Sequence, residues 1–224
     1  MKNSSDNTTS VIPMPTIRRL PLYHSFLLTI KKNERKYISG PDIAKELNVH
    51  STQIIKDFSY IKVKGKPKVG YEIDTLIKIL EGFLGYHIKR KAFIVGIGNL
   101  GKALIKYHEF HNEGMDIIAG FDIDSKKLKK NINSLNLYHI DKFKERISET
   151  PVDIGIIVVP ADQAQKIADT MIKYGIKAIW NFSATPLSAP DNIIIENTSI
   201  DSSLAMIKWK LHENKPLIYK NRVL

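Results

Sequence analysis

The sequence has no cysteine among its 224 residues. This absence excludes a disulfide scaffold, a thiolate metal site and cysteine-based catalysis, and it suits a reducing compartment. Long apolar runs are also missing. None approaches the roughly 20 residues that cross a bilayer, and the polar start MKNSSDNTTS does not have the pattern of a secretion signal. We therefore expect a soluble, cytoplasmic protein with no membrane partner.

Acidic residues are fewer than basic ones: the sequence has 23 Asp and Glu, 34 Lys and Arg, and a formal net charge of +11. The excess lies mainly in residues 1–90, which hold 16 basic and 8 acidic residues, whereas residues 91–224 hold 18 and 15. A uniform enrichment in lysine would not produce this asymmetry. A basic first part joined to a nearly neutral remainder predicts a module that binds a polyanion such as nucleic acid, attached to a separate body.

The basic part has the pattern of a winged helix-turn-helix domain. Residues 1–15 are rich in Ser, Asn and Thr, and we expect them to be disordered. Apolar spacing predicts four helices, the last three with N-caps, that start near Thr16, Ser39, Ser51 and Asp74. Residues 63–71 have a lysine-rich centre and are typical of a β-hairpin wing. We therefore predict a winged-helix DNA-binding domain over residues 16–88.

The remainder of the chain alternates between strand and helix patterns. Strands are expected at residues 92–95, 117–121, 154–159, 176–180 and 193–195, with helices at 102–110 and 161–174. Strands separated by helices form parallel, doubly wound sheets that are covered on both faces. We therefore predict an α/β protein in which a Rossmann-like domain over residues 89–198 follows the winged-helix domain.

A last helix is expected over residues 199–211, within a C-terminal helix and tail that spans residues 199–224. Leu204, Ile207 and Leu211 share one side of this helix, which also carries a tryptophan. A free terminal helix does not expose so much apolar surface. The helix must therefore cover either its own chain or a partner subunit.

The sharpest motif is GIGNLG at residues 96–101, which follows a predicted strand and opens a helix. In a dinucleotide-binding turn, Gly96 permits the tight bend, Gly98 lets a pyrophosphate approach the backbone, and Gly101 lets the helix pack on the strand. Asp122 ends the next strand, where a carboxylate accepts hydrogen bonds from a ribose 2′-hydroxyl and repels a 2′-phosphate. NAD(H) is therefore favoured over NADP(H), although two lysines follow closely and weaken that preference.

Two later strand ends point to the same crevice. Residues 158–160 and 181–183 are expected on the nicotinamide side, where an apolar pocket would favour the neutral reduced ring. Alternatively, these are ordinary strand–loop junctions, and the glycine turn belongs to an unliganded or CoA-binding fold. The predicted NAD(H) site consists of Gly96, Gly98, Asn99, Leu100, Gly101, Asp122, Val159, Pro160, Asn181 and Phe182.

No constellation of catalytic side chains accompanies this motif. The pattern Tyr-x-x-x-Lys at residues 138–142 falls before the fourth strand, where short-chain dehydrogenases have no catalytic helix, and the histidines lack metal-ligand spacing. We therefore predict no enzyme activity, no catalytic residue and no metal. Two alternatives stay open at this point: a small NAD-dependent oxidoreductase with a basic accessory domain, and a CoA- or nucleotide-binding regulator that does not touch DNA.

The third predicted helix carries residue types that read double-stranded DNA. Gln pairs well with adenine and Lys with guanine or a phosphate, whereas Ile55 either contacts a thymine methyl group or packs inward. Lysines on the wing suit phosphates or a narrow minor groove. The predicted DNA-binding residues are Arg18, Arg19, His50, Ser51, Thr52, Gln53, Lys56, Ser59, Lys64, Lys66 and Lys68.

Over roughly residues 16–211 the sequence resembles the Rex family of bacterial redox-sensing transcriptional repressors. The segments that carry the resemblance are IRRLPLY (17–23), QIIKDFSY (53–60), GKPKVGY (65–71), GIGNLGKA (96–103), GFDID (120–124), Val159-Pro160 with Gln165, and Asn181-Phe182. The resemblance implies a winged-helix domain, an NAD(H)-binding Rossmann domain and a homodimer that exchanges its C-terminal helix. It also implies repression at a palindromic operator, released by NADH.

Three positions depart from the family pattern. The family usually has two adjacent basic residues before the aspartate of the third helix, and here they are Ile55 and Lys56. Its Asn-Phe-Ala-Pro segment is Asn-Phe-Ser-Ala at residues 181–184, and an acid near the last helix falls on Ser199. These changes bear on the operator sequence and on the discrimination between NADH and NAD⁺, and not on the fold.

Overall fold

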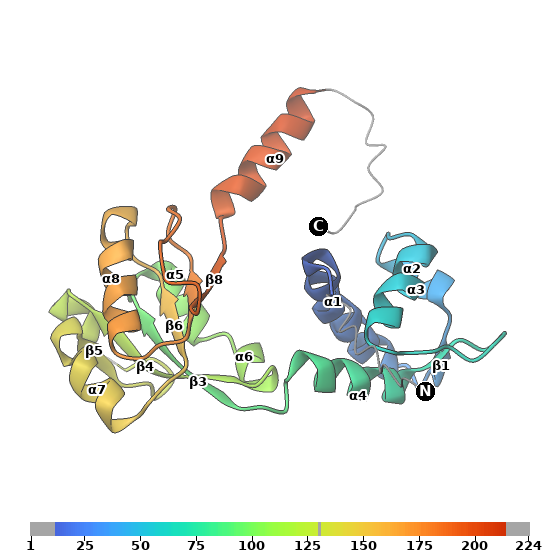
Figure 1. Ribbon diagram of the computed structural model, residues 1–224, viewed down its shortest axis with the longest axis horizontal. Helices are drawn as coiled ribbons and strands as arrows, with labels where there is room; N and C mark the ends of the chain where they lie inside the picture. Colours follow the sequence, from blue (N-terminus) through green and yellow to red (C-terminus); the bar gives the residue numbers. More distant parts are fainter. Residues whose placement is uncertain (1–11, 130, 214–224) are drawn as a thin grey trace, which may run out of the picture. The chain divides into compact units, whose positions relative to one another are not determined.

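The computed structural model describes residues 12–129 and 131–213 (Figure 1). These residues form two compact units that divide after Gly85, and each has its own hydrophobic core. The segment expected to be disordered, residues 1–15, lies mostly outside the described residues, as does the tail after residue 213. No helix in the described ranges is long and apolar enough to cross a membrane.

The N-terminal unit contains four helices and a two-stranded sheet in its described part. These elements are α1 (Met14–Lys31), β1 (Tyr37–Ile38), α2 (Gly40–Glu46), α3 (Ser51–Tyr60), β2 (Tyr71–Glu72) and α4 (Ile73–Leu84). The helices meet in one core, in which Leu20, Tyr23, Ile54, Phe58 and Leu80 are almost completely buried. α2 and α3 are joined by a short turn, which gives the predicted helix-turn-helix.

The N-terminal ends of the helices show which of the predicted N-caps are present in the structure. Ser39 is the N-cap of α2, as predicted, and its Oγ accepts a hydrogen bond at 3.2 Å from the backbone amide three residues on. The predicted caps Ser51 and Asp74 are wrong, because α3 begins at Ser51 itself, after His50, and α4 follows Glu72. Glu72 is paired in β2, so an extended strand residue already occupies the cap position of α4.

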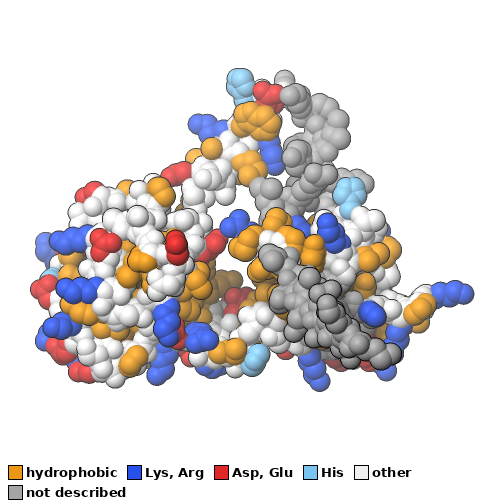
Figure 2. Space-filling view, in the orientation of Figure 1, with side chains coloured by type: hydrophobic (Ala, Val, Ile, Leu, Met, Phe, Trp, Pro, Cys, Tyr) orange, Lys and Arg blue, Asp and Glu red, His pale blue; other side chains and the backbone are white. Residues whose placement is uncertain are grey.

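Of the hairpin predicted over residues 63–71, only a single bridge forms within the loop, and the last residue of that range begins β2. β1 and β2 pair antiparallel, and beyond them a bridge joins Lys66 to Gly70. Gly70 has φ +95°, and a Cβ there would lie 2.3 Å from the Ile38 carbonyl oxygen, so this turn requires glycine. The loop projects from its own unit, and basic side chains are visible at its tip (Figures 1 and 2).

The second unit is built on a six-stranded parallel sheet. Its strands are β3 (Arg90–Val95), β4 (Met115–Asp122), β5 (Leu137–His139), β6 (Ile154–Ile157), β7 (Ala178–Asn181) and β8 (Ile194–Asn197). They lie in the order β5-β4-β3-β6-β7-β8, and all neighbouring pairs are parallel. This is the doubly wound Rossmann order, whose direction reverses between β3 and β6. The predicted fold class is confirmed, although β5 was not expected.

Helices cover both faces of this sheet. α5 (Asn99–Ile105) and α6 (Glu109–Asn112) follow β3, α7 (Phe143–Glu149) follows β5, and α8 (Ala161–Lys173) follows β6. Ala92 and Ile94 of β3 belong to the core on the α5 side, whereas Phe93 and Val95 belong to the core with α7 and α8. The single helix predicted over residues 102–110 is thus two helices, α5 and α6, separated by a turn.

The last described element is α9 (Ile200–His212). Ser199 caps it, since its Oγ accepts a hydrogen bond from the Ser202 amide at 3.1 Å. None of its residues is buried by the described part of the chain, and Leu204, Ile207 and Trp209 are 54%, 55% and 58% exposed. Hydrophobic side chains are visible on this helix in Figure 2. The apolar side predicted from the sequence is therefore present and uncovered.

Candidate cofactor cavity and nucleic-acid interface

The turn from β3 into α5 carries three glycines in different environments. Gly96 has φ +105°, and a Cβ there would lie 2.2 Å from the Val158 carbonyl oxygen. A Cβ on Gly101 would lie 2.0 Å from the Gly96 carbonyl oxygen, so neither position admits a side chain. A Cβ on Gly98, in contrast, would meet no atom within 4 Å. The middle glycine leaves open space beside the backbone, which is what a diphosphate needs for close approach.

A cavity of about 350 Å³ opens beside this turn, where the strand order of the sheet reverses. Ligands of open α/β sheets bind at this switch point, at the carboxyl ends of the strands. Half of the ten predicted cofactor residues line the cavity, namely Gly96, Gly98, Asp122, Val159 and Pro160. The residues predicted from the glycine motif and from two different strand ends are therefore brought together.

Asp122 is the last residue of β4 and is buried in the wall of this cavity. Its carboxylate accepts hydrogen bonds from the backbone amides of Ile97 (2.7 Å) and Asp124 (2.9 Å). The Lys127 ammonium lies 3.1 and 3.3 Å from the two carboxylate oxygens. Burial raises the pKa of Asp122, but these donors outweigh burial and hold the pKa below its usual range. The group is therefore charged at neutral pH.

Asn181 and Phe182 differ from expectation, because neither lines the cavity. Asn181 is fully buried, and its side-chain amide donates to the Thr185 carbonyl and to Asn197 Oδ1, both at 2.8 Å. Its own Oδ1 accepts from the backbone amide and the hydroxyl of Ser183. These bonds join β7 to β8 and to the loop that follows β7. Phe182 packs in the core on the α5 side of the sheet.

Six lining residues lie outside the predicted set of ten, although Val158 belongs to a strand end that was expected at this crevice: Val95, Ile123, Lys127, Val158, Gln163 and Ile167. Gln163 and Ile167 lie four residues apart on α8 and so share one face of that helix. Both residues follow the strand end at Pro160 closely in the sequence, and this position could have identified them as lining residues. The predicted residues Asn99, Leu100 and Gly101 form the first turn of α5, outside the lining.

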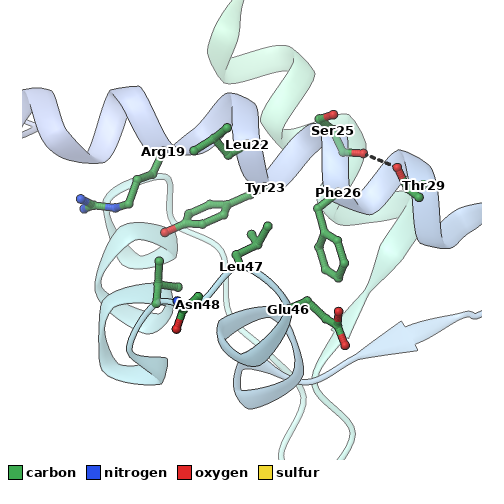
Figure 3. Close-up of a pocket in the computed structure, with 10 residues that line it drawn as sticks. Arg19, Leu22, Tyr23, Ser25, Phe26, Thr29, Glu46, Leu47 and Asn48 are labelled. Carbon is green, nitrogen blue, oxygen red and sulfur yellow. Dashed lines mark hydrogen bonds between the residues drawn. The ribbon is translucent and has the colours of Figure 1, made fainter. Parts of the chain in front are cut away.

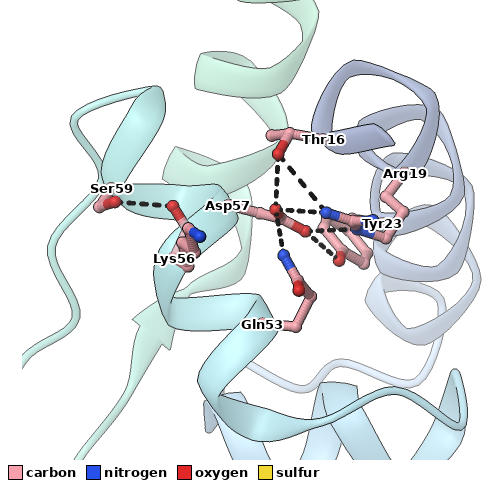
Figure 4. Close-up of polar contacts among 7 residues, drawn as sticks. All are labelled: Thr16, Arg19, Tyr23, Gln53, Lys56, Asp57 and Ser59. Carbon is pink, nitrogen blue, oxygen red and sulfur yellow. Dashed lines mark hydrogen bonds and ion pairs between the residues drawn. The ribbon is translucent and has the colours of Figure 1, made fainter. Parts of the chain in front are cut away.

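In the N-terminal unit, Asp57 is the centre of a buried hydrogen-bond network that joins α3 to α1 (Figure 4). The Arg19 guanidinium donates from Nε to Oδ2 and from Nη2 to Oδ1, both at 2.7 Å, in a bidentate ion pair. Tyr23 donates to Oδ2 at 2.6 Å, while Thr16 and Gln53 donate to Oδ1 at 2.9 and 2.8 Å. The network fixes the orientation of α3 on α1.

The pKa shifts in this network all favour the ion pair. Burial raises the pKa of Asp57, but the donors, led by Arg19, outweigh burial and hold it below its usual value. The hydrogen bond to Asp57 raises the pKa of Arg19, and burial together with the same carboxylate raises that of Tyr23. At neutral pH the pair is charged and the tyrosine is neutral, so every donor keeps its proton.

This network corrects the prediction for two DNA-binding residues. Arg19 is 7% exposed and Gln53 is half-buried, and both direct their polar groups to Asp57. Sequence spacing placed them on the surface because it could not show their common partner. They position α3 and do not extend from it.

The other predicted residues of the N-terminal unit are mostly exposed. Of those at α3, Ser51 is half-buried and the exposed ones are His50, Thr52, Lys56 and Ser59. Ile55 is 58% exposed, so it does not pack inward. Arg18 is exposed on α1. The outward side of α3 therefore combines cationic, polar and apolar groups of the kinds that contact base edges.

Three lysines of the wing loop are also exposed: Lys64, Lys66 and Lys68. The Lys66 ammonium lies 5.4 Å from the centre of the Tyr37 ring, which ties the loop to β1 through a cation–π contact. Ammonium groups gathered on one projecting loop suit contacts with phosphates.

A second cavity, of about 450 Å³, lies between α1 and the α2–α3 turn (Figure 3). Leu22, Phe26 and Leu47 give it apolar walls, and Glu46 and Asn48 lie at its lining as well. No group of three or more His, Asp or Glu side chains that could hold a metal ion occurs anywhere in the described ranges.

Two family models match the two halves of the chain. The model for a putative DNA-binding protein N-terminus matches residues 11–59, and the model for a CoA binding domain matches residues 87–185. The first match falls on the unit with the helix-turn-helix, and the second on the unit with the parallel sheet and the glycine turn.

Curated relatives cover almost the whole chain. The redox-sensing transcriptional repressor Rex of Bacteroides thetaiotaomicron is 40% identical over 204 residues, 91% of this chain and 93% of that protein. The repressor of the same name from Treponema denticola is 38% identical over 201 residues, 90% of this chain and 96% of that protein. The similarity therefore includes both units.

Solved structures agree with these relatives. The crystal structure of RSP in complex with β-NAD⁺ and operator DNA superposes with a TM-score of 0.85 and 33% identity, covering 91% of this chain and 94% of that chain. The complex of RSP with β-NADH gives a TM-score of 0.81 and covers 91% of this chain and 96% of that chain. RSP is described as a Rex-family repressor.

Proposed function

The chain belongs to the Rex family of redox-sensing transcriptional repressors, and from this membership we propose that it binds a palindromic operator and releases it when NADH binds. Its relatives are repressors, which confirms the expectation that the chain is not an enzyme. The observation that carries the proposal is the open space at Gly98 beside a buried carboxylate, in a chain whose α3 also exposes Lys56.

We propose that the cavity at the switch point holds NAD(H). Gly98 supports this assignment, because a side chain there would fill the space that a pyrophosphate needs. Asp122 would accept from the adenosine ribose, and Val158, Val159 and Pro160 would give the apolar surface against which a neutral ring is preferred to a charged one. The group supplies no chemical reaction in this role, since the protein senses its redox state through differential affinity.

The DNA contacts proposed for this chain follow from exposure. His50, Thr52 and Lys56 on the outward side of α3 would reach base edges, and the wing lysines would contact phosphates. Asp57 and Arg19 would act indirectly, by fixing the angle at which α3 leaves the core. Specificity then depends on a rigid α3, while the lysines supply affinity that falls with salt.

A homodimer is the assembly that a palindromic operator requires, since a two-fold site is read by two copies of α3. The uncovered apolar side of α9 supports a dimer in which this helix covers the partner subunit, as the family resemblance implies. Such an arrangement would let a change at the cofactor cavity alter the spacing of the two reading helices. We place this activity in the cytoplasm, where a transcriptional repressor meets both DNA and dinucleotide.

A titration of DNA binding with dinucleotide tests the proposal. A palindromic duplex is first selected by the protein from a randomised library, and its affinity is then measured by fluorescence anisotropy with NADH, with NAD⁺ and without either. We expect NADH to weaken binding at least about tenfold and NAD⁺ to leave it nearly unchanged. A scrambled duplex is the control. Equal effects of NADH and NAD⁺, or no selected duplex, would contradict the proposal.

A further inference from the structure

We propose that Ile55 reads the 5-methyl group of a thymine in the major groove, so that each half of the operator has an A·T pair where α3 presents this side chain. The inference deepens the proposed function and rests on it. It starts from an apolar side chain that the structure leaves exposed on a helix whose other outward groups are polar or charged.

The helix α3 has one buried side and one outward side. Ile54 and Phe58 are completely buried in the core of the N-terminal unit, and Asp57 is buried against α1. Ile55 lies outside this buried side and is 58% exposed. Among the described residues of α2 and α3, it is the only large apolar side chain that is exposed. Loose packing of the helix therefore does not explain its exposure.

The neighbours of Ile55 make its surroundings on α3 partly apolar. Thr52 and Ser59 are exposed and lie three and four residues away from it, so they share its face of the helix. Thr52 contributes a second methyl group. The Ser59 hydroxyl donates to the Lys56 carbonyl at 2.6 Å, so its proton is already used within the helix (Figure 4). Ile55 is consequently suited to an apolar partner.

Thymine offers the apolar group that matches this side chain. In the major groove, an A·T pair presents the thymine 5-methyl beside its hydrogen-bonding groups, whereas a G·C pair presents hydrogen-bonding groups without a methyl. Contact between the isoleucine and the methyl removes both apolar surfaces from water, which favours the complex. Against a G·C pair, the isoleucine would remove water from polar base edges and give them no partner. Ile55 therefore favours A·T at the base pair that it faces.

Replacing single thymines by deoxyuridine tests the inference at one methyl group, because deoxyuridine pairs with adenine in the same way and lacks only the 5-methyl. The duplex is the one that the protein selects from a randomised library, and each thymine of a half-site is replaced in turn. Fluorescence anisotropy gives the dissociation constants. At one position we expect affinity to fall about fourfold, the effect of burying one methyl group, and about 16-fold when both half-sites are changed.

Three variants assign the effect to a side chain. Ile55→Ala should remove the loss at that thymine, and since Ile55 is exposed, the truncation leaves the core intact. Ile55→Val keeps part of the aliphatic surface and should give an intermediate loss, which decides the question if Ile55→Ala binds too weakly to be measured. Ile194→Ala is the matched control, because this isoleucine is 69% exposed on β8 of the second unit. It should keep the full loss.

Two results would overturn the inference. One is an equal loss in the parent and in the Ile55 variants, which would mean that another side chain contacts the methyl group. The other is a selected half-site in which every thymine can be replaced by deoxyuridine with a change in affinity below about 1.5-fold. If the folded parent selects no duplex, the proposed function itself fails. The two failures are therefore distinguishable.

Discussion

The buried ion pair between Asp57 and Arg19 allows us to predict how much stability is lost when one of its charges is removed. Asp57→Asn preserves the size of the side chain and removes its charge, while Arg19 stays charged and 7% exposed. Neutralising one partner of a buried pair costs about 3–5 kcal/mol, because the remaining charge keeps its desolvation penalty and loses its counter-ion. Whole domains are stable by only about 5–15 kcal/mol. We therefore expect α3 to lose most of its protection in this variant.

Hydrogen exchange followed by mass spectrometry measures the effect where it occurs. Peptides from α3 should exchange at least about 100-fold faster in Asp57→Asn than in the parent, as a loss of roughly 3 kcal/mol requires. The two tryptophans, Trp180 and Trp209, both lie in the second unit, so their fluorescence follows that unit separately. The denaturant midpoint reported by tryptophan should not change, which gives an internal control for the variant.

The same carboxylate predicts a pH dependence of known sign. Because its donors lower the pKa of Asp57 in the folded chain, its contribution is fully present above the unfolded pKa of about 3.9. The contribution is lost as pH falls through the lower, folded value. Protection of α3 in the parent should therefore be flat from neutral pH to about pH 5 and should fall in more acidic solution. In Asp57→Asn this acid-dependent loss should be smaller, with the remainder due to Asp42 and Asp74, whose pKa values folding also lowers.

A double-mutant cycle decides whether the pair itself is responsible. Arg19→Met removes the other charge, and combining it with Asp57→Asn leaves no uncompensated ion in the core. The double variant should be more stable than the sum of the two losses by at least about 1.5 kcal/mol. Additive losses, or a cost below about 1 kcal/mol for Asp57→Asn alone, would refute the reasoning that this pair fixes α3.

Four further variants test the remaining sites. Gly98→Val places a side chain in the open space of the glycine turn and should weaken NADH binding at least about 100-fold by calorimetry, with the fold retained in circular dichroism. Lys56→Ala should remove discrimination between operator and random duplex, whereas Lys66→Ala should weaken binding to both and reduce the salt slope by about one unit. Deleting residues 199–224 should give a monomer that binds NADH but not operator, and a stable dimer in light scattering would contradict the role given to α9.

The features that the sequence predicts well are those decided by neighbouring residues. The three glycines of the β3–α5 turn have the backbone geometry and the space expected from their spacing, because geometry there depends on a few consecutive residues. The N-cap at Ser39 is likewise local. The cavity is also predictable in outline, since a doubly wound sheet brings the ends of β3 and β6 together wherever that strand order occurs.

Two predicted site residues, Arg19 and Asn181, have partners that are distant in the sequence. Arg19 reads as a surface cation because its counter-ion, Asp57, is 38 residues away in the sequence. Asn181 lies at a strand end, where a polar side chain can contact a ligand, but its amide donates a hydrogen bond to Asn197 on the neighbouring strand. In both cases a polar side chain is satisfied inside the protein, and only the fold shows which partner reaches it. The three-residue strand β5 is too short to leave a periodic pattern.

The burial of Arg19 also explains why an arginine occupies that position and limits how this unit binds DNA. A guanidinium donates to both oxygens of Asp57 at once, which the single ammonium of a lysine cannot do with the same geometry. Its charge is consequently paired with Asp57 inside the protein. The predicted cations that stay exposed are Arg18, Lys56, Lys64, Lys66 and Lys68. Each phosphate contact steepens the salt dependence by about 0.9 units, so removing one such contact should lower the slope by about that amount. Four of these five groups are lysines, which act on phosphates as point charges, so base discrimination must come from the side chains that α3 presents.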